Sequence, residues 1–89
     1  MMLNASGDLG AAMFKTWSEE QQREEIGKLV KGFRNGLPLG VLCKMAETIA
    51  GSREKAREHL HHFLSPKERK KAIAKESGGM KQIAEEYLL

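Results

Sequence analysis

Turn-forming residues divide this 89-residue chain into short segments, and within most of them apolar residues recur three and four positions apart. Ile26, Leu29, Val30 and Phe33 follow this spacing, which places all four on one face of a helix. Similar spacings return in residues 39–50, 56–64 and 80–88. β-branched residues never alternate with polar ones, so no segment predicts a strand. We therefore expect an all-α fold, a compact bundle of about five short helices.

Capping signals mark where these helices should begin and end. Ser65-Pro66-Lys67-Glu68 is the clearest, because it combines a cap serine, proline at the first helical position and glutamate at the third. Ser52 should cap the preceding helix, and Thr16 or Ser18 the first one, which Asn35-Gly36 should end. Pro38 is expected at a first helical position, and Ser77-Gly78-Gly79 at the end of the helix that starts near Ser65.

The chain is long enough for one domain and too short for two, since domains usually run to about 100–150 residues. Residues 1–13 lack a periodic apolar face, so we expect a flexible N-terminal tail there and a single helical domain over 14–89. The segment around Val41 and Met45 is apolar over most of its circumference, which predicts the central helix. Gly27 and Gly32 lie inside the first helix and suggest the close approach of another helix.

Positive charge is concentrated in one part of the chain. Residues 52–81 hold nine Lys and Arg against four Glu, whereas the net charge of the whole chain is only +3. Within this block Lys67, Lys71 and Lys75 form one row at a spacing of four, nearly opposite Ile73. Arg53, Arg57 and His61 form a second row on the preceding helix. Rows of like charge cost a helix stability, so they favour an anionic partner. The candidate binding residues are Arg53, Lys55, Arg57, His61, Lys67, Lys70, Lys71, Lys75 and Lys81.

Two functions fit this charge distribution. The first is a small DNA-binding regulatory protein, as a monomer or a homodimer, that contacts phosphates through the basic helices of residues 52–75. Double-stranded DNA is the expected target, because no aromatic residue interrupts the basic rows to stack on single-stranded bases. The second is a protein-interaction module, an adaptor or a small inhibitor, that docks on a larger protein such as a nucleic-acid enzyme.

A helix-turn-helix is one way to pair two of these helices, and two windows fit its spacing. Ala74, Gly78, Ala84 and Tyr87 fit all four slots, but the second helix would then expose Glu85 and Glu86. The other window has Ala46, Ala50, Gly51 and Ala56, with alanine in the glycine slot. Its second helix would present Arg53, Lys55 and Arg57 near its start, where base contacts are usually made.

The chain contains few residues of the types and spacings that form catalytic or metal-binding sites. Asp8 is the only aspartate and Cys43 the only cysteine, and no glycine-rich loop follows a strand, so we expect no enzyme and no cofactor. His59, His61 and His62 cluster, but a tetrahedral metal site needs at least two more ligands, which only Cys43 or a glutamate could supply, and we expect ordinary helical histidines. The single thiol and the absence of a long apolar run predict a soluble, cytoplasmic protein that does not enter a membrane.

Overall fold

The structure, a computed structural model, describes residues 17–89, which contain helices and no strand. The helices are α2 (Glu19–Arg34), α3 (Leu39–Ala50), α4 (Arg53–Phe63), α5 (Pro66–Ala74) and α6 (Gly78–Leu88). The prediction of an all-α bundle of about five short helices is confirmed for this part of the chain. The proposed tail at 1–13, its boundary with the helical domain and the alternative cap Thr16 lie outside the described residues.

Local capping interactions start three of the helices where the sequence predicts. Ser18 accepts a hydrogen bond from the backbone of Gln21 at the start of α2, and Ser52 accepts one from Lys55 at the start of α4. Ser65 and Glu68 form a reciprocal capping box at α5, with Pro66 at the first turn. Because each of these contacts joins residues three apart, the sequence alone contains the whole signal.

Two helix boundaries differ from the prediction. Pro38 is the N-cap of α3, with ψ at 144°, so the helix begins one residue later than expected. α5 ends at Ala74, before Ser77, and α6 already begins at Gly78. Gly78 has a φ of +60°, a left-handed conformation that residues with a side chain rarely adopt, and this glycine allows the sharp change of direction between the two helices.

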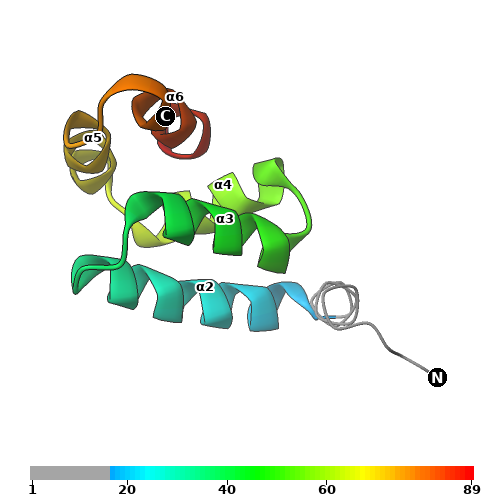
Figure 1. Ribbon diagram of the computed structural model, residues 1–89. Coiled ribbons are helices and arrows are strands. Elements are labelled where there is room, and N and C mark those ends of the chain that lie inside the picture. The colour runs from blue at the N-terminus through cyan, green and yellow to red at the C-terminus, as the bar shows by residue number, and fades with distance from the viewer. Residues whose placement is uncertain (1–16) are drawn as a thin grey trace, which may run out of the picture.

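The core forms where α3 meets three other helices. Figure 1 shows α2 on one side of α3 and α6 on the other, and α3 packs against α2, α4 and α6. Ile26, Leu42, Leu60, Leu64 and Leu88, which come from four helices and the link between α4 and α5, are fully buried together. α3 contributes more buried residues than any other described helix, as its composition predicts.

Two side chains of α3 that were expected in the core are instead exposed. Val41 and Met45 are 40% and 44% exposed, because they lie on the one side of α3 that no described helix covers. Ile83, which belongs to the apolar spacing of residues 80–88 on α6, is 41% exposed. The sequence pattern overestimated how much of these two helices is covered.

One of the two glycines within α2 marks a close approach, as predicted. A Cβ atom at Gly27 would lie 2.9 Å from Cζ of Phe63, so the missing side chain makes room for the aromatic ring at the end of α4. At Gly32 a Cβ atom would be 3.9 Å from the nearest atom of Leu37, an ordinary contact. The close approach of α2 and α4 therefore explains Gly27 but not Gly32.

Candidate functional site

The nine candidate binding residues separate into two groups in the structure. Arg53, Lys55, Arg57 and His61 lie on α4, where they interact with neighbouring helices. The lysines at 67, 70, 71 and 75 lie on α5 or at its C-cap, and Lys81 lies in the first turn of α6; all five are exposed. The two groups differ in whether their cationic groups already contact carboxylates or backbone oxygens of the protein. We call a cation with such a partner occupied, and one without it unoccupied.

The basic residues of α4 contact acidic side chains of neighbouring helices. Arg53 forms an ion pair with Glu86 on α6 at 2.6 Å, and its guanidinium lies 5.4 Å from the ring centroid of Tyr87. Glu86, the nearest negative charge, raises the pKa of Arg53. Lys55 forms an ion pair with Glu19 on α2, which lowers the pKa of that carboxyl group. These charges are directed toward other helices of the same protein.

Arg57 binds the C-terminal end of α6. Its guanidinium donates hydrogen bonds to the backbone oxygens of Glu86, at 2.6 Å, and of Leu89, at 3.3 Å. Carbonyl groups at the end of a helix lack partners within the helix and carry partial negative charge, so a cation stabilises them. Arg57 is therefore occupied by the fold, although its spacing in the sequence predicted an anion contact.

His61 also faces inward more than the sequence suggests. Its side chain is half-buried, and Nε2 is buried without a hydrogen-bond partner among residues 17–89. Burial lowers the pKa of His61, and the nearby Arg69 and Arg57 lower it further. The ring therefore remains neutral to a lower pH than an ordinary histidine and adds no positive charge at neutral pH.

The lysines of α5 form an exposed surface with unoccupied charges. Ala72 and Ile73 turn toward the core, which leaves Lys67 and Lys71 on the opposite side and the exposed Lys70 between the two sides. Ala74, a small side chain, is exposed among them. Within residues 17–89 no carboxylate lies within ion-pair distance of Lys67, Lys70, Lys71, Lys75 or Lys81. We call these five residues the lysine surface.

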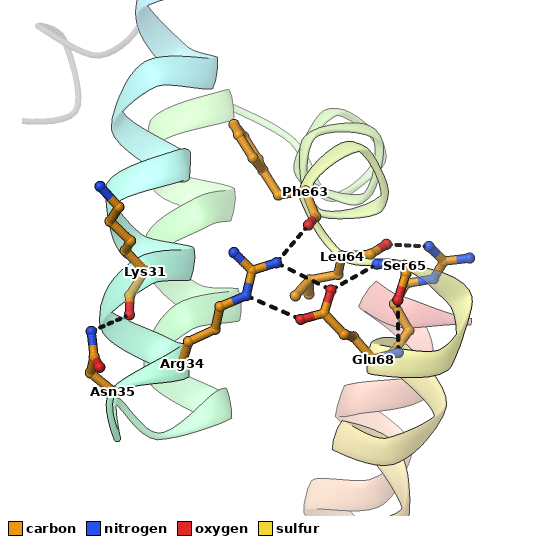
Figure 2. Close-up of polar contacts among 8 residues, drawn as sticks. Lys31, Arg34, Asn35, Phe63, Leu64, Ser65 and Glu68 are labelled. Carbon is orange, nitrogen blue, oxygen red and sulfur yellow. Dashed lines mark hydrogen bonds and ion pairs between the residues drawn. The ribbon is translucent and has the colours of Figure 1, made fainter.

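Two arginines that the sequence did not single out hold α5 in place. Arg34, at the end of α2, donates to both carboxylate oxygens of Glu68 at 3.1 Å and to the backbone oxygen of Phe63 at 3.0 Å, as Figure 2 shows. Arg69 donates to the backbone oxygens of Leu64 and Leu88, at 2.6 and 3.0 Å. Because Arg34 and Arg69 already donate to Glu68 and to the nearby carbonyl groups, these acceptors do not pair with the neighbouring lysines.

A small groove lies between α2 and α5, beside the lysine surface. Its volume is about 250 Å³, and its lining consists of Phe33, Arg34, Glu68, Lys71, Ala72, Lys75 and Glu76. Phe33 packs against the core with part of its side chain exposed. No signal in the sequence indicated this groove, because Phe33 and Lys71 are far apart in the chain and only the packing of α2 near α5 brings them together.

A wider groove of about 740 Å³ lies between α2 and α4 and has the opposite electrostatic character. From α2 it is lined by three glutamates and one arginine together with a glutamine, and from α4 by a histidine and a phenylalanine: Glu19, Glu20, Gln21, Arg23, Glu24, His62 and Phe63. The molecule therefore separates its charges, with acidic side chains around the start of α2 and unoccupied lysines on α5.

Neither helix-turn-helix window is confirmed. In the α5–α6 window Ala74 is exposed, although the motif needs this small residue buried between the helices. In the α3–α4 window Ala46, Ala50 and Ala56 are buried, but the cations of α4 are occupied as described above. The structure therefore offers no second helix of such a motif with an unoccupied basic face.

The described residues do not gather the donors of a metal site. No group of three or more His, Cys, Asp or Glu in residues 17–89 is close enough to hold an ion. His59 is buried, with 1% of its surface exposed, while His62 is exposed with its ring edge-on to Phe63, at 4.9 Å between ring centroids. Burial raises the pKa of the Cys43 thiol to about 12, which leaves it protonated and a poor nucleophile.

No helix in residues 17–89 has the length and apolar character needed to cross a membrane. Comparison with protein-family models, with curated proteins and with solved structures found no match to this chain.

Proposed function

We propose that this protein binds nucleic acid, without catalysing a reaction, by contacting phosphates through the lysine surface. The observation that carries the proposal is the contrast between the two basic groups. The cations of α4 are occupied by Glu19, Glu86 and backbone oxygens, whereas the five lysines of α5 and α6 are exposed and unoccupied. Unoccupied cations lose little when they exchange water and counterions for phosphate groups.

The spacing of the lysines suits a phosphate backbone. Lys67, Lys71 and Lys75 follow one another at about 6 Å of helix rise, and phosphates of one duplex strand follow at about 3.4 Å along the helix axis. Successive lysines can therefore reach nearby phosphates of the same strand. The exposed Ala74 leaves room for the backbone to approach. Contacts of this kind give affinity without base specificity, so a regulatory role would require a further determinant.

Salt dependence of binding tests the proposal. With five phosphate contacts, the affinity for duplex DNA should fall with a log–log slope on salt concentration of about −4.5. The triple variant K67Q/K71Q/K75Q should bind at least about tenfold more weakly at low salt, with a slope nearer −2. The matched control K28Q/K31Q/K44Q removes the same charge from exposed positions on α2 and α3 and should bind like the wild type. If the protein binds neither duplex nor single-stranded nucleic acid at low salt and micromolar protein, the proposal is refuted.

Docking on a larger protein is a second candidate function, and the exposed pair Val41 and Met45 favours it. The two side chains lie one turn apart on α3 and expose apolar surface of the kind found at the centre of interfaces. Under this alternative, V41T/M45Q should abolish capture of a specific partner, and the lysine variant should reduce only the rate of association. Under the first proposal V41T/M45Q should leave nucleic-acid binding unchanged.

The proposed partner also bears on where the protein works. A nucleic-acid partner and a single cysteine without a disulfide partner both fit the reducing environment of the cytoplasm. Self-association into a homodimer stays a prediction, and sedimentation equilibrium with and without nucleic acid tests it.

A further inference from the structure

The groove between α2 and α5 places an aromatic side chain beside two lysines of the lysine surface. Phe33 and Ala72 contribute apolar lining, and Lys71 and Lys75 lie at the side formed by α5. The sequence shows no aromatic residue among the basic rows, and on that ground it disfavoured base stacking. The tertiary structure supplies one from another helix.

The charges around the groove favour an anion. Arg34 and Glu68 neutralise each other through two hydrogen bonds, and Glu68 also caps α5. Lys71 and Lys75 have no carboxylate partner within residues 17–89, and Glu76 is the one other acidic residue of the lining. The groove therefore combines apolar surface with a positive edge, which are the two features needed to bind a base and its neighbouring phosphates.

We propose that this groove receives an unpaired base of single-stranded nucleic acid, with Phe33 against the base and Lys71 and Lys75 on the flanking phosphates. The bases of a duplex are already stacked and paired, so they cannot enter the groove without unpairing. The protein should therefore prefer single strands to duplexes. This inference rests on the proposed nucleic-acid function and specifies the form of nucleic acid that it binds.

Fluorescence anisotropy with a labelled 12-nucleotide single strand and the duplex of the same sequence tests the preference. The wild type should bind the single strand about tenfold more tightly, since one base stacked on an aromatic side chain contributes about that factor or more. Equal affinity for the two, or a preference for the duplex, would overturn the groove proposal and leave the lysine surface intact. Binding to neither would overturn both.

Substitution of Phe33 tests the role of the ring. F33L keeps an apolar side chain against the core and should bind the single strand no more tightly than the duplex. F63L makes the same change at the aromatic residue of the acidic groove and should retain the preference. If F33L retains the preference, the proposal is wrong. Melting temperatures by circular dichroism identify any variant that has lost the fold.

Two further variants keep the test informative if F33L folds poorly. F33W should preserve the single-strand preference, and the fluorescence that it adds to that of Trp17 should be quenched by a single strand but not by the duplex. The double variants K71Q/K75Q and K67Q/K70Q each remove two charges from α5, but only the first pair lines the groove. The first should reduce single-strand affinity more than the second, and equal effects would contradict the placement of the flanking phosphates.

Discussion

Arg34 joins α2 to α5 by donating a hydrogen bond to each carboxylate oxygen of Glu68, at 3.1 Å, and a third to the backbone oxygen of Phe63. A planar guanidinium suits such paired acceptors, and lysine cannot reproduce the geometry. The pair fixes the edge of the groove and engages the only carboxylate in the first turn of α5. Both side chains are close to half exposed, so the pair contributes more to orientation than to stability.

The first prediction concerns the pH dependence of this pair. The hydrogen bonds from Arg34 lower the pKa of Glu68 below its ordinary value of 4.5. The resulting stabilisation is present above pH 4.5 and disappears as the pH falls through the lowered pKa of the folded protein. R34Q should therefore be less stable than the wild type at neutral pH, and the difference should shrink in acid to the part that the hydrogen bond to the Phe63 oxygen contributes. Urea unfolding at a series of pH values measures it, and a difference that stays the same from neutral pH into acid would contradict this account.

The second prediction concerns the buried His59. Its Nδ1 accepts a hydrogen bond from Arg23 at 3.2 Å, and Nε2 lies 3.4 Å from the side-chain oxygen of Gln22. Burial lowers the pKa of His59, Arg23 and Lys55 lower it further, and Glu19 and Glu58 oppose this shift. Because the unfolded chain takes up a proton more readily, stability is complete above the ordinary value of 6.5 and declines as the pH falls below it.

Unfolding free energies between pH 7 and pH 5 test this second prediction. H59Q should lose less stability over this range than the wild type, with part of the slope left to His61, whose pKa is also lowered. H62Q makes the same substitution at the exposed neighbour on α4 and is the matched control. An unchanged slope in H59Q would show that His59 is not the titrating group.

A third prediction compares the two glycines of α2. Alanine is favoured over glycine within a helix by up to about 1 kcal/mol. G32A should realise most of this gain, because its Cβ would meet Leu37 at an ordinary 3.9 Å. G27A should gain less or lose stability, because its Cβ would lie 2.9 Å from the ring of Phe63, which must then move. Thermal unfolding of the two variants gives the order, and a more stable G27A would show that the ring moves at little cost.

The fourth prediction separates binding from stability on α5. Like charges four residues apart destabilise a helix by a few tenths of a kcal/mol per pair, whereas the positions of Lys71 and Lys75 at the C-terminal end of α5 offset this cost. K67Q/K71Q/K75Q should therefore melt close to the wild type while it loses nucleic-acid affinity. A clear drop in melting temperature would mean that these lysines have structural partners.

Much of the local structure could be predicted from the sequence. Ser65 and Glu68 cap α5 through contacts three residues apart, and the row of lysines opposite Ile73 follows from the helical period alone. The same local rule placed Arg53 and Arg57 on one face of α4. It could not show that Glu86 and the end of α6, about 30 residues away, occupy both of them.

The sequence by itself determined the helices, most of their caps and the faces that carry charge, because these depend on residues within one or two turns of each other. The tertiary structure decided which charges remain free and which aromatic side chain lies near them. Arg53 and Lys55 are occupied while Lys71 and Lys75 are not, and Phe33 lies in the groove beside the latter. These outcomes depend on which helices meet, and that is set by the burial of Ile26, Leu42, Leu60 and Leu88 in a shared core.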